Sequence, residues 1–205
     1  VYKRQDKQVI RMEIGVTEAV QERVKKTKIS ESKNPSLVFC WDTHLTKTKG
    51  RNVLFIVNAS NRYTIAMTDI EPRNWNYYTM YISRVIHGVM QEMGYSEEQI
   101  EQYFKLSGDV LATKTHGKKS VGGINRMVMD ARNFDKKLEK EAKYQWELSE
   151  YLNRDVCHPE GFDAYGYPSE FFKLDMERLG IIPKRKPAKV IDFKQYVEMK
   201  GDIDH

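Results

Sequence analysis

Four side chains that can bind anions or transfer protons lie close together within residues 109–127, whose sequence is DVLATKTHGKKSVGGINRM. They are Lys114, His116, Lys118 and Lys119. They crowd a short connection that leads to Ser120, a residue type favoured at the start of a helix. The unpaired N–H groups and partial positive charge of a helix start attract anions, and neighbouring lysines add to this attraction. The stretch therefore predicts a site for a phosphate-bearing ligand.

The helix expected to follow Ser120 begins with two glycines, Gly122 and Gly123. Each costs about 1 kcal/mol in a helix relative to alanine, so the pair indicates close approach by a ligand or by another backbone. A phosphate at this helix start would accept hydrogen bonds from the backbone of residues 121–123, with Asn125 and Arg126 on the flank. The local pattern GKKS lacks the upstream glycine of a nucleotide-hydrolysing phosphate loop, so that class of enzyme is not indicated.

Basic residues gather in two windows that contain no acid. The first window, residues 43–68, holds Lys47, Lys49, Arg51 and Arg62, and the second, residues 110–129, holds Lys114, Lys118, Lys119 and Arg126. The whole chain has a net charge of +5 and a pI near 9.0. Because the two windows together carry more positive charge than the whole chain, the residues outside them are net acidic. This segregation predicts a positive face on which Lys47 or Arg51, Arg62 and the basic loop line one concave surface. Trp41, just before the first window, and His44, within it, are included as further ligand contacts.

Enzymatic chemistry has weaker support in the sequence. His44 and His116, with lysines to stabilise phosphate charge, could cleave phosphodiesters without a metal, but no spacing between them supports it. Asp42, Asp69 and Asp109 each stand alone at an expected strand end, so no carboxylate cluster for Mg²⁺ is indicated. We therefore expect no metal, no cofactor and no catalytic residue. An aromatic residue such as Trp41 could stack on a base, although strand aromatics are more often part of a core.

Composition bounds the class of protein. With 205 residues, of which 40% are hydrophobic and 31% charged, the chain can fill one core, or one core with an appendage. Its two cysteines, Cys40 and Cys157, are far apart and follow no CxxC spacing, which argues against a disulfide framework or a zinc site and favours a reducing cytoplasm. No apolar run reaches about 18 residues, so we expect neither a membrane span nor a membrane partner.

The two ends of the chain differ from its middle. The opening VYKRQ resembles translated sequencing-library DNA, so residues 1–7 are expected to be a non-native start in a metagenomic protein of bacteria or their phages. Residues 8–155 are expected to form the core domain. Residues 156–205 are expected to form a C-terminal extension, with a short helix at 168–179, a basic linker at 183–189 and a tail.

Hydrophobic periodicity predicts an α+β fold. Expected strands are 8–15, 37–45, 52–58, 62–68 and about 109–114, and expected helices are 18–28, 74–93, 96–106 and a long one from Ser120 that continues towards 153. Turn signals between 37–45, 52–58 and 62–68 indicate a three-stranded antiparallel meander. We expect a small, mostly antiparallel sheet packed against several helices.

Three stretches carry a resemblance to a known family. They are LVFCWDTHL at 37–45, VNASNRY at 57–63 and ATKTHGKKSVGGIN at 112–125. Together they resemble an uncharacterised bacterial domain of unknown function, with a Trp-containing strand, an Asn/Arg-Tyr turn and a Thr-Lys strand leading into a Ser-x-Gly-x-x-Asn helix start. The resemblance covers about residues 8–153 and implies a single α+β domain, but it implies no activity.

These patterns together favour non-enzymatic binding of a phosphate-bearing ligand, a nucleotide or a nucleotide-derived signal, through the basic loop. Nucleic-acid binding through the same face is the alternative, and a metal-free nuclease or phosphodiesterase is a weaker one. The expected partner is a phosphorylated small molecule or a nucleic acid, and the sequence leaves the oligomeric state open, a homo-oligomer included.

Overall fold

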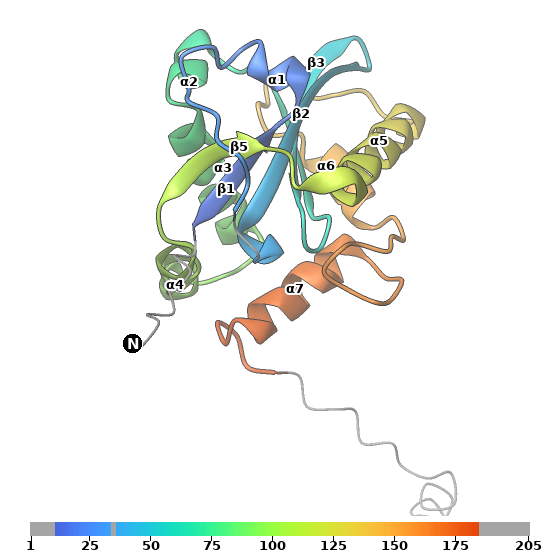
Figure 1. Cartoon of the computed structure of the whole chain (residues 1–205). Helices are drawn as coiled ribbons and strands as arrows, with labels where there is room; N and C mark the ends of the chain where they lie inside the picture. Colours follow the sequence, from blue (N-terminus) through green and yellow to red (C-terminus); the bar gives the residue numbers. More distant parts are fainter. Residues whose placement is uncertain (1–10, 34–35, 185–205) are drawn as a thin grey trace, which may run out of the picture.

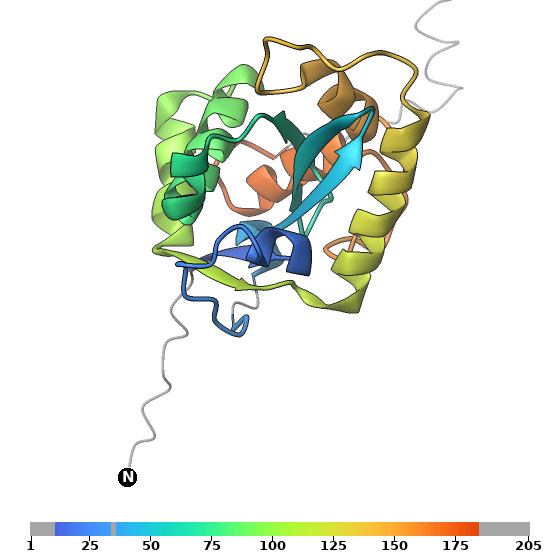
Figure 2. The ribbon, with the colours of Figure 1, turned by 90° about the horizontal axis from the view of Figure 1, so that it is seen from above.

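A five-stranded sheet lies at the centre of the molecule, between two layers of helices (Figures 1 and 2). The computed structural model describes residues 11–33 and 36–184. The expected non-native start, the first residues of the expected strand 8–15 and the expected tail lie outside the described residues. The strands are β1 (Met12–Val16), β2 (Cys40–Thr48), β3 (Arg51–Asn58), β4 (Thr64–Thr68) and β5 (Val110–Lys114). The α-helices are α1 (Glu18–Gln21), α2 (Pro72–Asn76), α3 (Tyr78–Glu92), α4 (Glu97–Ser107), α5 (Gly117–Asn133), α6 (Trp146–Asn153) and α7 (Pro168–Arg178).

The sheet is mixed, with the strand order β4-β3-β2-β1-β5. The antiparallel meander is confirmed, because β2 pairs with β3 and β3 with β4 in antiparallel register. The expectation of a mostly antiparallel sheet is wrong: β1 runs parallel to both β2 and β5. The physical reason lies in the connections. The connection from β1 to β2 is long and contains α1, and β5 reaches the other side of β1 only after the helices α2 to α4; parallel neighbours require long connections of this kind.

Alternation along the strands divides the core between the two faces of the sheet. One face presents Ile14, Trp41 and Ile56 to a large cluster that includes residues of α3, α4 and α7. The other face presents Val53, Phe55 and Val57 to α5 and α6. Successive side chains along one strand therefore pack against different helices, and both faces of the central strands are buried.

Several helix boundaries differ from those that hydrophobic periodicity predicts. Ser96 begins α4 with a complete capping box to Gln99, as its sequence indicates. The expected helix 18–28 is only the single turn α1, and the expected helix from Ser120 to 153 is two helices, α5 and α6, separated by residues 134–145. Helix α5 begins earlier than expected, at Gly117, with His116 as the residue before its first turn. Ser120 therefore lies inside α5, in its first turn, and does not cap it.

The C-terminal part of the described chain packs on the same core as the strands. Phe172 of α7 is 1% exposed, and its ring lies 5.1 Å from that of Tyr63 and 6.1 Å from that of Trp41. Asp175 of α7 accepts a hydrogen bond from Asn61 at 2.9 Å. Helix α7 therefore contributes to the same core as the strands, and the expected division near residue 155 stays a prediction. No helix within the described residues is long and apolar enough to cross a membrane.

Candidate functional site: a buried histidine between two carboxylates

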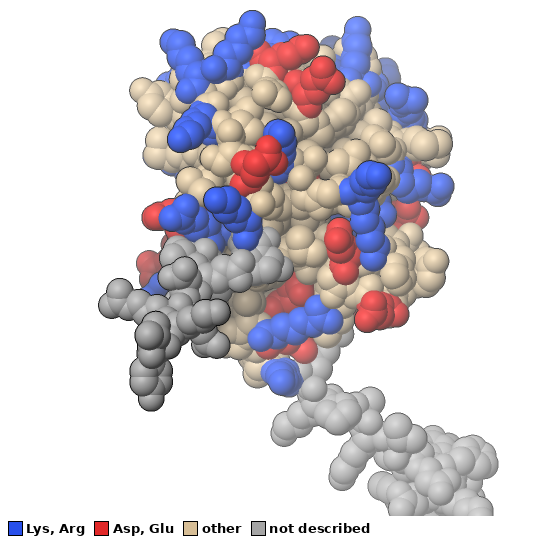
Figure 3. Space-filling model, in the orientation of Figure 1, with Lys and Arg blue, Asp and Glu red and all other residues tan. Residues whose placement is uncertain are grey.

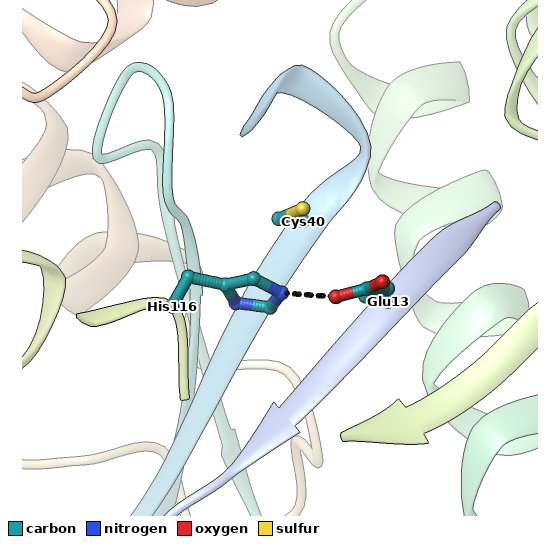
Figure 4. Close-up of side chains that lie close together, drawn as sticks. All are labelled: Glu13, Cys40 and His116. Atoms are coloured by element: carbon teal, nitrogen blue, oxygen red, sulfur yellow. Dashed lines mark hydrogen bonds and ion pairs between the residues drawn. The ribbon is translucent and has the colours of Figure 1, made fainter. Parts of the chain in front are cut away.

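His116, at the junction of β5 and α5, lies between carboxylates from two different strands, Glu13 and Asp42, and Figure 4 shows it facing the first of them. Its Nδ1 is 2.7 Å from Asp42 Oδ1 on β2, and its Nε2 is 3.0 Å from Glu13 Oε2 on β1. The exposed fractions of the three side chains are 2% for His116, 4% for Glu13 and 0% for Asp42. The arrangement is a fully buried ion cluster on the face of the sheet that α5 covers.

Asp42 also contacts the N-terminal turn of α5, whose N-cap residue is His116. Both of its carboxylate oxygens accept the backbone N–H of His116, at 3.3 Å, and Oδ2 accepts the hydroxyl of Ser120. A helix N-terminus has unpaired N–H groups and a partial positive charge, so a carboxylate here satisfies donors and is itself stabilised. Ser120, in the first turn of α5, thus donates its hydroxyl to Asp42, a residue more than 70 positions away along the chain.

Glu13 and Cys40 complete the cluster from neighbouring strands. Glu13 Oε1 accepts the backbone N–H of Lys33 at 2.9 Å, so both of its oxygens have partners. Cys40 is the register partner of Glu13 in the parallel pair of β1 and β2 and is 0% exposed. Its thiol interacts with the imidazole of His116. Side chains of register partners in a sheet lie on the same face, which is why these two groups meet.

Gly15 makes room for this arrangement. It pairs with Asp42 across the two parallel strands, and a Cβ at Gly15 would overlap Asp42 Oδ1 and lie 3.1 Å from His116 Nδ1. Because no side chain can occupy this position, the carboxylate and the imidazole lie directly against the strand backbone. The glycine is needed here for close approach and not for an unusual backbone angle.

The charges of the cluster determine its protonation. Burial by itself would lower the pKa of His116, but hydrogen bonds to Asp42 and Cys40 and their charges raise it to about 11. Burial raises the pKa of the Cys40 thiol, and the nearby imidazole offsets this only in part. Near neutral pH the metal-free cluster is therefore an imidazolium with two carboxylate partners, beside a neutral thiol.

This order of contacts does not match nucleophilic catalysis. In a serine hydrolase triad the histidine contacts the serine hydroxyl, whereas here Ser120 donates to Asp42 and His116 binds carboxylates at both nitrogens. A cysteine nucleophile requires a lowered pKa and access to solvent, and Cys40 has neither. The cluster can hold a helix in place, or hold an ion, but it is not arranged to attack a substrate.

A small cavity lies on the outer side of the same helix turn. Its volume is about 110 Å³. It is lined by the turn after β3, the first turns of α5 and residues 158–160. Its polar and basic lining residues include Arg62, Lys119, Ser120 and His158, and Glu160 also contributes to the wall. Arg62 Nη2 donates to the carbonyl of Gly123 at 2.6 Å. Ser120 therefore connects the buried cluster on one side with the cavity on the other.

The family model described as "Domain of unknown function (DUF6933)" matches residues 13–171. The chain belongs to the DUF6933 family. The match begins at Glu13 and ends within α7, so it includes the whole ion cluster and the cavity. No curated protein and no solved structure gives a significant match.

Within this DUF6933 domain, the structure gathers only part of the predicted site. Lys119, Ser120, Gly122, Gly123 and Arg62 line the cavity. A Cβ at Gly123 would lie 3.2 Å from Arg62 Nε, so this glycine admits the guanidinium, whereas nothing lies within 4 Å of the corresponding position at Gly122. The backbone N–H groups of residues 121–123 lie beyond the first turn of α5 and are used within the helix, so the expected backbone contacts there are wrong.

The other predicted site residues lie elsewhere. Lys47 and Arg51 flank the β2–β3 turn, at the far end of β3 from Arg62, and a strand of this length spans roughly 23 Å, so the single concave surface expected from the two windows does not form. Trp41 is buried in the core, where its Nε1 donates to Tyr103 Oη at 3.0 Å. His44 is half-buried, and its Nδ1 lies 3.2 Å from Thr17 Oγ1.

Acids that lie outside the two basic windows in the sequence form ion pairs with some of their basic residues. Three predicted site residues form ion pairs: Arg51 with Asp69, Lys114 with Glu31, and Arg126 with Asp130. Lys118 and Asn125 are exposed and do not line the cavity. An acid-free window in the sequence therefore does not imply a bare positive surface, because acids beyond its ends, such as Asp69 and Asp130, pair with its basic residues.

The sequence analysis missed Glu13, Cys40 and His158 and considered Asp42 only as an isolated acid. One signal was available for two of them: Glu13 and Asp42 are acids inside strands whose neighbours are apolar, and a charged residue inside a buried strand needs a partner. The partner itself could not be read from the pattern.

Proposed function

We propose that this DUF6933 domain binds a phosphate-bearing ligand, without catalysis, in the 110 Å³ cavity beside α5. The observation that carries the proposal is the convergence of Arg62, Lys119 and His158 on one small cavity. Arginine and lysine are common phosphate ligands, and a histidine can donate to the same oxygens. The ligand is a nucleotide or a nucleotide-derived signal, of which the cavity would receive the phosphate.

The hydrogen-bonding capacity of Arg62 supports this proposal. Among the contacts of the described residues its guanidinium uses one N–H, to the carbonyl of Gly123, and that contact holds the group at the cavity wall. Arg62 itself has a positive φ of 64°, as part of the tight turn that follows β3. A preorganised guanidinium with spare donors binds an anion at a lower entropic cost than a freely rotating lysine.

The size of the cavity limits what enters it. A volume of about 110 Å³ is roughly that of four water molecules in the liquid, which is enough for a phosphate group but not for a nucleoside. The base and sugar would therefore remain outside. At the N-terminus of α5, Asp42 already accepts the backbone N–H of His116, so the proposal does not rely on that group. Side chains on the flank of the helix supply the contacts instead.

Nucleic-acid binding through the same face is the second candidate, and its support is weaker. Figure 3 shows basic side chains distributed over the visible face with acidic ones among them, without a continuous positive groove. A groove of one sign is the usual footprint of a protein that follows a polyanionic backbone. The nuclease alternative loses its main residue, because the imidazole of His116 is 2% exposed and both ring nitrogens face carboxylates.

Isothermal titration calorimetry with orthophosphate, a panel of mononucleotides and a short single-stranded RNA tests the proposal. Lys119→Ala should weaken binding of the best phosphate-bearing probe about ten- to a hundredfold, because one charge-assisted contact is worth about 1.5–3 kcal/mol. Lys118→Ala is the matched control: this lysine is exposed on the same turn but does not line the cavity, so its loss should change affinity less than twofold. Glu160→Gln should raise the affinity, because a carboxylate leaves the cavity wall.

The outcomes separate the candidates. Equal losses from Lys118→Ala and Lys119→Ala, with RNA bound more tightly than any mononucleotide and a steep dependence on salt, would favour a polyanion-binding surface. No heat with any probe, at concentrations where orthophosphate sites usually fill, would reject the proposal.

The cellular setting is part of the proposal. Cys40 and Cys157 are both free and buried, so no disulfide contributes to the fold and a reducing cytoplasm would suit the protein.

A further inference from the structure

We propose that Glu13, Cys40 and His116 bind a transition-metal dication with the ligand preferences of Zn²⁺. A carboxylate oxygen, the Cys40 Sγ and an imidazole nitrogen lie within 4.8 Å of one another, and all three residues are buried. Figure 4 shows the three side chains pointing into the same space from β1, β2 and the β5–α5 junction. This site is distinct from the phosphate cavity, and the inference does not depend on the function proposed above.

The donor set selects the metal. Thiolate and imidazole ligands favour Zn²⁺ and related transition metals over Mg²⁺ and Ca²⁺, which prefer oxygen ligands alone. Bonds of about 2.0–2.3 Å to a tetrahedral ion place its ligand atoms roughly 3.3–3.8 Å apart. The Nε2 of His116 and Oε2 of Glu13 are 3.0 Å apart, and the most distant ligand pair needs to close by about 1 Å at most to reach that range. Small rotations about the side-chain bonds of these residues can change the distances between ligand atoms by this amount.

The surrounding hydrogen bonds are those of a metal site. A histidine ligand commonly donates its second ring N–H to a carboxylate, which fixes the tautomer that presents the other nitrogen to the metal. Asp42 has this role, at 2.7 Å from Nδ1 of His116, and leaves Nε2 facing Glu13 and Cys40. Carboxylate ligands are usually held by further hydrogen bonds, and the backbone N–H of Lys33 holds Glu13 Oε1.

Exchange of the metal for protons conserves the charge of the cluster. Binding of M²⁺ to Nε2 of His116 and to Sγ of Cys40 displaces one proton from the imidazolium and one from the thiol. Two protons leave as two positive charges enter, and no electron is transferred, so the oxidation state of the metal is unchanged. The buried cluster therefore accepts the ion without added net charge, which would be costly at this depth.

Thr113 offers a buried hydroxyl on the same face of the sheet as Glu13 and Asp42. Thr113 of β5 is the register partner of Gly15, is 0% exposed, and its hydroxyl makes no hydrogen bond among the described residues. Three protein ligands leave one position of a tetrahedral ion to water. Strand β5, next to β1, thus offers a hydroxyl that can hydrogen-bond to a metal-bound water. An apolar core would leave this hydroxyl without a partner.

The test uses the full chain after removal of metals with a chelator and titration with Co²⁺, followed by displacement with Zn²⁺. We expect one equivalent of Co²⁺ to produce a thiolate-to-cobalt charge-transfer band and a tetrahedral visible spectrum, both abolished by Zn²⁺. The chain has two cysteines, so the assignment rests on two matched variants. Cys157→Ser should keep the band and Cys40→Ser should lose it. Asp42→Asn should weaken Co²⁺ binding by about 10- to 100-fold while keeping the band.

Cys157→Ser is decisive even if Cys40→Ser does not fold, because a thiolate band in that variant can arise only from Cys40. A band that vanishes in Cys157→Ser would assign the metal to the other cysteine and overturn the proposal. Absence of a band in the wild-type chain at several equivalents of Co²⁺ would leave the cluster as a metal-free imidazolium held by two carboxylates.

Discussion

Gly15 of β1 and Asp42 of β2 lie side by side in parallel register, and the carboxylate of Asp42 fills the space that a side chain at Gly15 would need. The first prediction follows from this contact. Gly15→Ala should lower the free energy of unfolding by about 1–3 kcal/mol, because both the strand backbone and Asp42 are held from several sides and cannot yield cheaply. Denaturant unfolding followed by circular dichroism measures it.

Gly88 of α3 is the matched control for that substitution, since nothing lies within 4 Å of a Cβ placed there. Gly88→Ala should stabilise the protein by up to about 1 kcal/mol through helix propensity. Similar effects of the two alanines would show that the space at Gly15 is not limiting.

The second prediction concerns Asp42 as the partner of a buried cation. Asp42→Asn keeps the size of the side chain but removes the charge opposite His116, and we expect a loss of about 3–5 kcal/mol of stability, because breaking a buried pair leaves an uncompensated charge. Asp69→Asn is the control, because Asp69 pairs with Arg51 at the surface with 61% of its side chain exposed, and such pairs contribute about 0–1 kcal/mol. Equal losses at the two positions would contradict the buried ion pair.

The third prediction is the protonation of His116 in chelator-treated protein. The pKa of about 11 lies above the ordinary value of a histidine, so the folded state binds the proton more tightly than the unfolded chain does. This stabilisation is complete below about pH 6.5, the unfolded value, and declines as pH rises from there through about 11. Nitrogen-15 NMR of the ring should report an imidazolium at pH 9. Neutral-tautomer shifts for this residue at pH 8 would show that its carboxylate partners do not hold the proton.

The fourth prediction tests whether α7 belongs to the domain. Phe172→Ala should cost about 3–5 kcal/mol, because the ring contacts aromatic side chains from β2, from the turn after β3 and from the chain before α4. Tyr165→Ala, at a position 79% exposed, is the control and should stay within about 0.5 kcal/mol of the wild type. A small effect of Phe172→Ala would support the view of residues 156–184 as an appendage.

Local sequence determined much of the secondary structure. The continuous apolar run in NVLFIVN and the turn signals around it located the meander, and Ser96 with Gln99 located the start of α4. These features depend on neighbours a few residues apart, which is why periodicity and capping rules find them. The same rules failed for α5. They favoured Ser120 as its cap, whereas α5 begins at Gly117 after His116, whose backbone N–H is held by a carboxylate from a strand 74 residues earlier.

The direction of β1 was not available from its own sequence. A strand of five residues shows which side chains alternate but not which neighbours it pairs with. The mixed sheet depends on how the helical connections cross over, and this depends on packing of the whole domain.

The predicted basic site was divided by the fold for a similar reason. Arg62 and Lys119 meet because the turn after β3 packs against α5, while Arg51 remains at the other end of its strand. Charge windows in a sequence record which residues are near one another along the chain, and a strand separates its two ends by its full length.

The sequence by itself determined that His116 precedes a helix, that it follows a strand, and that lysines and glycines surround it. Only the tertiary structure decided its chemistry. Glu13 is 103 residues away along the chain and Asp42 is 74, and the two carboxylates reach the imidazole because β1 and β2 run in parallel with Gly15 leaving the space between them. Burial then turned a residue expected in a solvated, ligand-binding loop into the centre of an ion cluster, because charges removed from water must find partners within the protein.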